Sequence, residues 1–315
     1  EAGREIYRAK LVIDEAVTGI SATSIAKELE RGNPAIHTRN YRLAQGEIFV
    51  DPRPLLAGQE MTIAERLKEI VRMANNMAEI KLNILAADVK NAKEIVDAAE
   101  GKVYIGVMVK PYPTVDAAVA YVNEMQEAGV PVSVGLGAAD PAMWRRVAET
   151  AVRTKPVHVN QVYPGAGYTV AALRAVGAEH SMVNAVIRPS GTAGKVSILT
   201  GPETSAFDEY VSCAAAAAAL KEIDIPSVKF YPIGGDQHLD EVAAMVRAAV
   251  AAGVTVFEPT GGINGDNVEA VVKTCLENGA EIIIPHIYTA FVDKETGRTD
   301  PKRVKDALDR LHRLL

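Results

Sequence analysis

The chain has 315 residues, of which 48% are hydrophobic, so it is long enough for a sizeable core and for roughly two domains. Its formal net charge of −6 lacks the basic excess typical of proteins that bind nucleic acid. No apolar run approaches the roughly 20 residues of a membrane-spanning helix, and the charged opening EAGREIYRAK lacks the apolar segment of a signal peptide.

The two cysteines, Cys213 and Cys275, each fall in a predicted helix, and we interpret them as small buried side chains in a reduced compartment. We therefore expect a cytoplasmic protein with no nucleic-acid or membrane partner. The chain opens on Glu1 rather than on Met, so we expect it to begin partway through a gene product or to have been processed.

Residues 1–72 are predicted to form a small α+β domain. The segment REIYRAKLVID favours a strand, and SATSIAKELERG favours a short helix with Ser21 or Thr23 as its N-cap and Gly32 at its end. The segment AIHTRNYRLAQGEIFVD is typical of a hairpin that turns near Gly46, and GQEMTIAERLKEIV of an amphipathic helix. This domain is short of catalytic residues.

From about residue 80 onward, short apolar and β-branched runs alternate with helical patterns. The predicted strands are KLNILA (81–86), VYIGVMV (103–109), VSVGLG (132–137), VHVNQV (157–162), MVNAVI (182–187), SVKFYPI (227–233), VTVFEPT (254–260) and EIIIPHI (281–287). The predicted helices cover 88–99, 114–128, 141–153, 167–177, 208–223, 238–252, 266–278 and 301–314.

Eight strands alternating with eight helices predict a (β/α)8 TIM barrel over residues 73–315, preceded by the small α+β domain. A doubly wound open sheet is the alternative, although such sheets rarely have eight units this regular. The segment 188–207 is longer than a connection between strand and helix requires, and it predicts an extra hairpin.

Barrels of this kind carry their working residues at the C-terminal ends of the strands and in the loops that follow. The polar residues at those places are therefore the candidates for a site. In strand order they are Asn83; Lys110; His158, Asn160 and Gln161; Arg188, Ser190 and Thr192; Lys229 and Tyr231; Glu258, Thr260, Gly261 and Gly262; and His286 and Tyr288.

Lys229 is a charged residue inside the β-branched and aromatic run SVKFYPIGG. On a strand it shares a face with Ser227 and Tyr231, while Val228 and Phe230 take the other face. If the first face points into the barrel, the amine loses water and its pKa falls. The free amine then attacks a carbonyl to form a Schiff base. The alternative is a lysine that reaches solvent from the outer face or from the strand end.

The segment EPTGGIN places Gly261 and Gly262 between a strand and a helix. Two glycines there let backbone N–H groups approach an anion, as in the phosphate sites that follow strands seven and eight of many barrels. An ordinary glycine-rich turn is the alternative. Glu258, just before the pair, is either a general acid or base or the counter-ion of Lys229, which would keep the lysine charged.

The histidines His158 and His286 are candidates for general bases, metal ligands or core residues with satisfied hydrogen bonds. The chain has no HxH, HxxxH or ExxH spacing, so we expect no metal site.

The segments VKFYP on strand six and PTGGI after strand seven resemble the 2-keto-3-deoxy-6-phosphogluconate (KDPG) aldolases. More closely, KLNILA, SVGLGAADP, HVNQV, SGTAGKVSILTGP and IIPHIYTAFVDKETG resemble the D-glucosaminate-pathway branch of that family, and the resemblance extends over about 79–315. It implies that Lys229 is the Schiff-base lysine. It also implies that Thr260, Gly261 and Gly262 form the turn for the substrate phosphate.

The second strand departs from this family pattern. KDPG aldolases of this motif carry a glutamate on strand two, and the second strand here, VYIGVMVKPYP, has no carboxylate. The base for proton transfer must therefore come from elsewhere, and the candidates are Glu258, His158 and His286, acting through a water.

Within residues 1–72, GNPAIHTRNYRLAQGEIFVDPRPL resembles the C-terminal small domain of pyridoxal-phosphate (PLP) enzymes related to selenocysteine synthase, in particular D-glucosaminate-6-phosphate ammonia-lyase. The resemblance implies that PLP and its lysine belong to a large domain that would precede Glu1. We therefore expect no ammonia-lyase activity from this chain. The presence of both resemblances on one chain is consistent with a natural fusion, with a truncation remnant and with an artificial joining near 72–79. An isolated small domain exposes the face that packs on its large domain, so we expect homo-oligomers and association with a PLP-dependent lyase.

Together these resemblances imply a class I aldolase that cleaves KDPG to pyruvate and glyceraldehyde 3-phosphate in D-glucosaminate catabolism, with no cofactor required in the barrel. Arg188, Ser190, Thr192 and Asn160 join the glycine turn as candidates for binding phosphate or carboxylate. One alternative is a metal-dependent aldolase or a sugar-phosphate epimerase on the same barrel. The other is a non-catalytic assembly module for a PLP-dependent lyase.

Overall fold

The computed structural model describes residues 8–56, 58–74 and 78–315, and the chain divides into two compact units, Glu1–Met77 and Ala78–Leu315. The division predicted after residue 72 falls inside a helix that continues to Ala74, so the structural boundary lies beyond it. In the described part of the chain, no helix combines the length and apolar character needed to cross a membrane.

In its described residues, the N-terminal unit packs three α-helices beside a two-stranded antiparallel sheet. Its elements are β1 Ala9–Val12, α1 Glu15–Thr18, α2 Ala22–Arg31, β2 Glu47–Val50 and α3 Gln59–Ala74. Ile25, Leu29 and Ile48 form its buried core. Ser21 caps α2 by accepting a hydrogen bond from the backbone N–H of Ser24, as one of the two predicted caps requires. The start of the predicted strand at 4–14 lies outside the described residues.

The hairpin predicted around Gly46 is largely wrong. Leu43–Gln45 forms a 3-10 turn (η1), and Gly46 has a φ of 75°, a conformation that favours glycine. Strand β2 pairs with the distant β1, with Leu11 opposite Ile48. The segment before Gly46, which was predicted to pair with β2, pairs with it, within the described residues, only through the isolated bridge between Arg39 and Phe49. Burial of Ile48 in the small core fixes this register, and sequence spacing alone does not reveal it.

The second unit contains ten parallel strands that occupy eight positions, because the first and last positions are each split into two short strands within the fully described range 78–315. The strands are β3 Glu79–Ile80, β4 Leu82–Leu85, β5 Val103–Met108, β6 Val132–Gly135, β7 His158–Val162, β8 Met182–Pro189, β11 Ser227–Phe230, β12 Val256–Pro259, β13 Ile282–Ile283 and β14 His286–Ile287. Because β13 pairs with β3 and β14 with β4, the sheet closes into a barrel.

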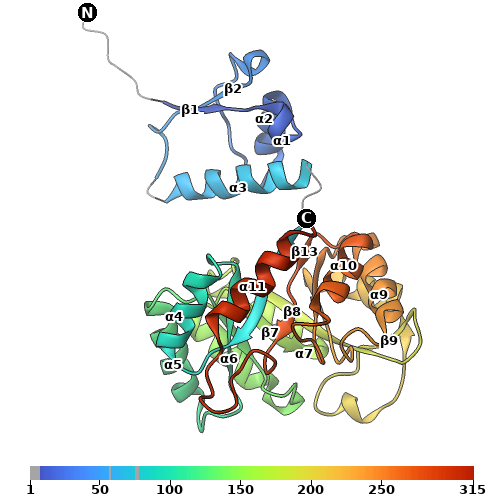
Figure 1. Cartoon of the computed structure of the whole chain (residues 1–315). Coiled ribbons are helices and arrows are strands. Elements are labelled where there is room, and N and C mark those ends of the chain that lie inside the picture. The colour runs from blue at the N-terminus through green and yellow to red at the C-terminus, as the bar shows by residue number, and fades with distance from the viewer. Residues whose placement is uncertain (1–7, 57, 75–77) are drawn as a thin grey trace, which may run out of the picture. The chain divides into compact units, whose positions relative to one another are not determined.

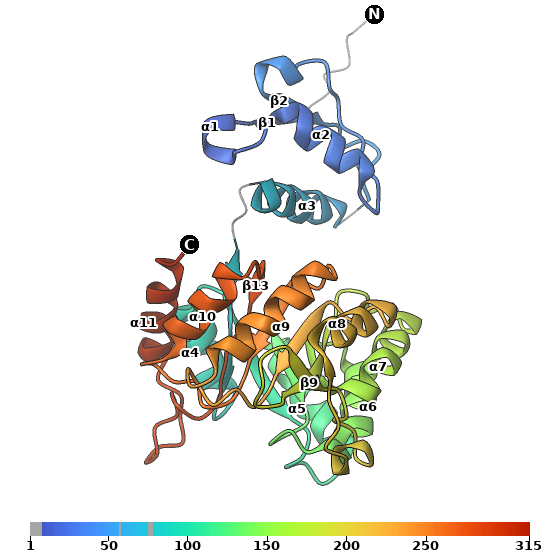
Figure 2. The same cartoon turned by 90° about the vertical axis from the view of Figure 1, so that its right-hand side faces the viewer.

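Eight helices surround this sheet within the described range 78–315, as Figures 1 and 2 show. They are α4 Val89–Ala98, α5 Val115–Glu127, α6 Trp144–Thr154, α7 Tyr163–Ala175, α8 Cys213–Glu222, α9 Leu239–Ala251, α10 Val268–Glu277 and α11 Pro301–His312. A short 3-10 turn, η2 Pro141–Met143, leads into α6. The predicted (β/α)8 barrel is therefore confirmed.

Two helices begin at residues other than those predicted. Helix α7 starts at Tyr163, earlier than expected, because Pro164 falls in its first turn, where a missing N–H costs nothing. Helix α8 starts only at Cys213, because the side chain of Ser212 caps it by accepting from the backbone N–H of Ala215.

The extra hairpin predicted within 188–207 is present. The end of β8, at Arg188 and Pro189, pairs antiparallel with β9 (Lys195–Ser197), and β9 pairs in turn with β10 (Val211–Ser212). A 3-10 turn, η3 Thr204–Ala206, lies between β9 and β10.

Candidate active site

The interior of the barrel is lined by an unusually polar set of side chains. Each lies on the strand face opposite the one that packs under the helices, as the alternation of strand residues requires. They are Asn83, Ser133, His158, Asn160, Asn184, Ser227, Lys229, Glu258 and His286, and all are buried. Buried polar groups are retained only where they are hydrogen-bonded, so the partners of each side chain define what the site can do.

Lys229 lies on β11 and points into the barrel, while its neighbours Val228 and Phe230 belong to the apolar core. Its side chain is nearly closed off from solvent, with 7% exposed. The amine Nζ donates a hydrogen bond of 2.9 Å to Asn160 Oδ1 and lies 5.7 Å from the ring centroid of Tyr288. Of the two orientations that the sequence left open for Lys229, the structure has the one toward the interior.

Burial lowers the pKa of Lys229 to about 8, and the negative charge of Glu258 opposes that shift. The hydrogen-bond acceptor nearest the amine is a neutral amide, which does not hold the proton as a carboxylate would. At pH 7 about a tenth of this lysine is consequently the free amine, far more than for an ordinary lysine, and that is the form that attacks carbonyl carbons.

Glu258 lies on the neighbouring strand β12, opposite Lys229 in the strand register, and its carboxylate serves four other side chains. His158 Nε2 lies 3.0 Å from Oε1, and His286 Nε2 lies 2.7 Å from Oε2. Asn184 Nδ2 donates to Oε2 at 2.7 Å, and the hydroxyl of Ser227 donates to Oε1. Burial would raise the pKa of Glu258, but His158 and His286 outweigh it and hold that pKa well below its usual range.

Hydrogen bonds hold both ring nitrogens of His158. The hydroxyl of Ser133 accepts from Asn83 Nδ2 at 2.9 Å and from Asn160 Nδ2 at 2.8 Å, so its own proton points to His158 Nδ1, 2.8 Å away. A carboxylate can only accept, so His158 donates to Glu258 from Nε2. Both ring nitrogens of His158 are occupied inside the barrel.

His286 is held at one nitrogen by Glu258, and its Nδ1 lies 3.1 Å from the hydroxyl of Tyr288. Burial, and next the charge of Lys229, lower the pKa of His286 to about 3, so the ring is neutral. Burial also raises the pKa of Tyr288, so its phenol is protonated. Tyr288 is half-buried, unlike the fully enclosed Glu258.

The predicted phosphate turn packs against a second glycine pair. Gly261 and Gly262 have φ values of 100° and 73°, and Gly235 donates its N–H to Gly261 O at 2.9 Å. A Cβ placed on Gly262 would lie 2.6 Å from the backbone N of Gly235, so only glycine fits. The hydroxyl of Thr260 donates to the backbone carbonyl of Glu258.

Arg188, Ser190 and Thr192 lie at the extra hairpin and stand apart from the hydrogen-bonded network of Lys229 and Glu258. The hydroxyl of Ser190 donates within its own turn, to Thr192 O and Lys195 O. Thr192 is exposed, and Arg188 is half-buried. The structure thus brings together Lys229, Asn160, Glu258, His158 and His286. Arg188, Ser190 and Thr192 lie outside this cluster, at the edge of the barrel.

Three members of the network were missed from the sequence: Ser133, Asn184 and Ser227 in its role as a donor to Glu258. A signal was present, since each is a small polar residue inside an otherwise apolar strand. In the described residues, no group of three or more His, Cys, Asp or Glu side chains is arranged to hold a metal ion.

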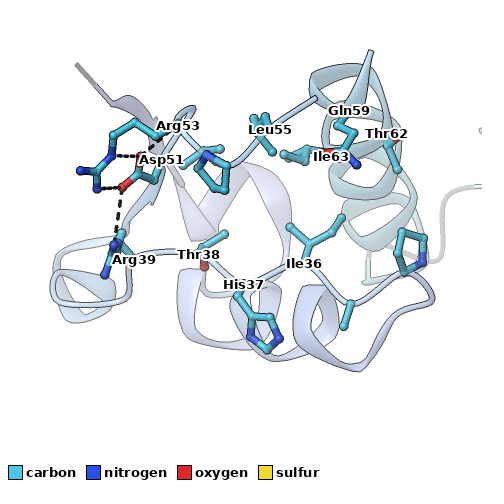
Figure 3. Close-up of a pocket in the computed structure, with 14 residues that line it drawn as sticks. Ile36, His37, Thr38, Arg39, Asp51, Arg53, Leu55, Gln59, Thr62 and Ile63 are labelled. Atoms are coloured by element: carbon cyan, nitrogen blue, oxygen red, sulfur yellow. Dashed lines mark hydrogen bonds and ion pairs between the residues drawn. The ribbon is translucent and has the colours of Figure 1, made fainter. Parts of the chain in front are cut away.

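The N-terminal unit has a separate pocket of about 820 Å³, shown in Figure 3. Arg53 Nε donates to Asp51 at 2.8 Å, and this hydrogen bond holds the pKa of Asp51 well below its usual range. Arg39 also forms an ion pair with Asp51, and these three charged residues lie at one end of the pocket. Thr62 and Ile63 of α3 form its other end. The complete lining is 34–39, Val50, Asp51, 53–55, Gln59, Thr62 and Ile63.

Comparison with known proteins places this barrel, with its buried lysine among carboxylate and imidazole groups, in the aldolase class. The family model described as KDGP aldolase matches residues 76–295. The chain is also 40% identical over 226 residues to the 2-dehydro-3-deoxy-phosphogluconate aldolase of Salmonella typhimurium, covering 71% of this chain and 92% of that protein. The chain therefore belongs to the KDGP aldolase family, and it is a lyase.

A segment of 74 residues has a different relative. It is 36% identical to the D-glucosaminate-6-phosphate ammonia lyase of Salmonella typhimurium, covering 24% of this chain and 20% of that protein. A solved structure of D-glucosaminate-6-phosphate ammonia-lyase matches with 35% identity and a TM-score of 0.23, over 24% of this chain and 20% of that one. Both resemblances expected from the sequence are confirmed.

Proposed function

We propose that the chain is a class I aldolase that cleaves 2-dehydro-3-deoxy-6-phosphogluconate to pyruvate and glyceraldehyde 3-phosphate. The observation that carries this proposal is the buried amine of Lys229, held at 2.9 Å by the neutral amide of Asn160 and with its pKa lowered to about 8. Membership of the KDGP aldolase family supports the choice of substrate.

Lys229 begins the reaction by attacking C2 of the keto acid. Loss of water gives an iminium, which withdraws electrons from the C3–C4 bond. Removal of the C4 hydroxyl proton breaks that bond, releases glyceraldehyde 3-phosphate and leaves an enamine on Lys229. Protonation of C3 restores the iminium, and its hydrolysis releases pyruvate and regenerates the amine.

The substrate phosphate binds, in this proposal, at the turn of Thr260, Gly261 and Gly262. Two successive glycines with positive φ and no side chains form this turn, so an anion can approach its backbone N–H groups closely. Arg188, half-buried near the end of β8, supplies a positive charge at the same end of the barrel, two strand positions from that turn. Ser190 and Thr192 belong to the same hairpin and serve to shape it.

A pathway also follows from the second resemblance. Elimination of ammonia from D-glucosaminate 6-phosphate, the substrate in the name of the lyase relative, yields a phosphorylated 2-keto-3-deoxy acid. That product has the carbon skeleton that a KDPG aldolase cleaves. We place the chain in D-glucosaminate catabolism on this chemical continuity.

A steady-state assay tests the proposed class. Pyruvate release from 2-dehydro-3-deoxy-6-phosphogluconate is measured for the full chain, for Lys229→Met, and for Lys273→Met, a control on the exposed face of α10. We expect loss of activity only in Lys229→Met and no effect of a chelator. Loss of activity in chelator, with Lys229→Met still active, would favour a metal-dependent aldolase instead.

A second role, docking on a PLP-dependent lyase, is favoured by the pocket of the N-terminal unit and by the lyase-like segment. Sedimentation of the full chain with purified D-glucosaminate-6-phosphate ammonia-lyase tests it. We expect a mixed complex that Thr62→Arg, a change on the pocket wall, weakens. Independent sedimentation of the two proteins would exclude this role.

A further inference from the structure

We propose that Tyr288 is the acid–base residue of the aldolase reaction and that it exchanges its proton with His286, which Glu258 holds in place. The inference rests on the proposed Schiff-base function and adds the proton-transfer group, which the second strand does not supply. Tyr288 directly follows β14, at the C-terminal end of the last strand position. Its ring lies beside Lys229 Nζ, so its hydroxyl and the amine share one end of the barrel.

Glu258, His286 and Tyr288 form a hydrogen-bonded row, and Glu258 determines which group donates at each step. Its carboxylate can only accept, so His286 donates from Nε2 at 2.7 Å. In the neutral ring Nδ1 then carries a lone pair, and it accepts the hydroxyl proton of Tyr288 at 3.1 Å. Tyr288 therefore rests with its proton directed at a base and with an oxygen lone pair free for a substrate hydroxyl.

Other members of the network are less suited to meet the substrate. The carboxylate of Glu258 is fully buried and accepts from four donors. His158 is fully buried and has both nitrogens occupied, by Ser133 and Glu258. Tyr288 is the half-buried member of this hydrogen-bonded row, and its neighbour His286 retains 3% exposure.

The proton moves twice and returns to carbon. Tyr288 oxygen takes the proton of the C4 hydroxyl while its own proton passes to His286 Nδ1, and the C3–C4 bond breaks toward the iminium. After the aldehyde has left, His286 returns the proton to Tyr288, and Tyr288 gives one to C3 of the enamine. One proton leaves oxygen and one reaches carbon, so no further reactant is needed.

The charges support this order of events. The positive charge of Lys229 contributes to lowering the pKa of His286. When the C3–C4 bond breaks, the iminium on Lys229 becomes a neutral enamine, so this repulsion disappears as His286 receives its proton. Glu258 then lies 2.7 Å from an imidazolium and stabilises it.

Tyr288→Phe tests the assignment, because it keeps the ring beside Lys229 and removes only the hydroxyl. Two measurements on the full chain separate the steps: trapping of pyruvate on Lys229 by borohydride, and exchange of pyruvate methyl protons with D₂O followed by NMR. We expect trapping to persist while exchange and kcat fall by about 100-fold or more. Tyr168→Phe, at an exposed position on α7, is the matched control.

The outcomes distinguish the inference from the function on which it rests. Exchange and kcat within a few-fold of the unchanged protein in Tyr288→Phe overturn the role of Tyr288. Loss of trapping in that variant also overturns it, because Tyr288 would then act in Schiff-base formation. Failure to trap pyruvate on Lys229 in the unchanged protein refutes the Schiff-base function instead.

His286 is assigned as a positioning residue and proton acceptor, and His286→Gln tests it. Glutamine retains a polar side chain but cannot take up the proton. We expect kcat to fall by at least about 10-fold with KM and pyruvate trapping little changed. An unchanged kcat would show that Tyr288 works without His286.

Discussion

Asn160 Oδ1 accepts the hydrogen bond of Lys229 Nζ at 2.9 Å, and it also accepts from Asn184 Nδ2 at 2.9 Å. Both lone pairs of this amide oxygen are therefore used, and the amide is fixed by Ser133 on its other side. The lysine is held in place by a neutral group, while the carboxylate of the neighbouring strand is engaged by four other donors. This arrangement keeps the amine in the barrel without neutralising its charge by an ion pair.

The pH dependence of cleavage should report the pKa of Lys229. We expect kcat/KM to rise with pH up to an apparent pKa of about 8, because only the free amine attacks C2. Asn160→Asp places a carboxylate beside the ammonium and raises that pKa, so the rising limb moves to higher pH. Activity at pH 7 should fall by about 10-fold or more. Asn123→Asp, at an exposed position of α5, is the control. If the rising limb of the pH profile stays in place in Asn160→Asp, then Asn160 does not set the pKa of Lys229.

We expect Lys229 to destabilise the folded state at neutral pH. Its folded pKa of about 8 lies below the ordinary value of 10.5, so the unfolded chain binds more protons between these two values. The penalty is complete below pH 8 and disappears as pH rises toward 10.5. We expect Lys229→Met to be more stable than the unchanged protein by up to about 3 kcal/mol at pH 7, with a smaller difference at pH 10. Urea denaturation at both pH values measures this, and an equal difference at both would be inconsistent with a desolvated ammonium.

The strand pattern predicted much of this site. Alternation along SVKFYPI placed Lys229 on one face with Ser227, although it did not say which face is the inner one. The positions of His158, Asn160, Glu258 and His286 on their strands marked them as candidates, and all four lie in the interior. Such predictions succeed because strand order and side-chain alternation in a barrel leave few arrangements.

The partners within the site were not predictable in the same way. Glu258 was expected to act as a base or as the counter-ion of Lys229, whereas its oxygens accept from residues on four other strands. Which of several neighbours a carboxylate chooses depends on register and on barrel closure, which link residues up to 100 positions apart. Likewise, the hairpin expected around Gly46 gave way to pairing of β2 with β1, because burial of Ile48 decided the register.

The glycine turn offers a test of phosphate binding. In Gly262→Ala the new Cβ meets the backbone of Gly235 at 2.6 Å, so the turn must shift. We expect KM for the phosphorylated substrate to rise by about 10-fold or more, while trapping of unphosphorylated pyruvate on Lys229 is little changed. Gly297→Ala is the matched control, because Gly297 has a φ of 68° but no atom near its Cβ position. Equal effects of the two substitutions would assign the change to backbone strain alone.

The barrel unit should work without the N-terminal unit. The two units have separate hydrophobic cores, one around Ile25 and Leu29 and the other around the barrel strands and helices. We expect residues 78–315 produced alone to cleave the substrate with kcat within about twofold of the full chain, since separate cores fold independently. A cooperative loss of activity and of thermal stability on removing 1–77 would mean that the first unit completes the enzyme.

Covalent trapping at Lys229 tests the central claim most directly. The full chain is reduced with borohydride in the presence of pyruvate, digested and examined by peptide mass spectrometry. We predict a pyruvate-derived adduct on the peptide that contains Lys229, formed together with loss of activity and absent from Lys229→Met. Unmodified Lys229 in protein that is still active after this treatment would contradict the Schiff-base mechanism.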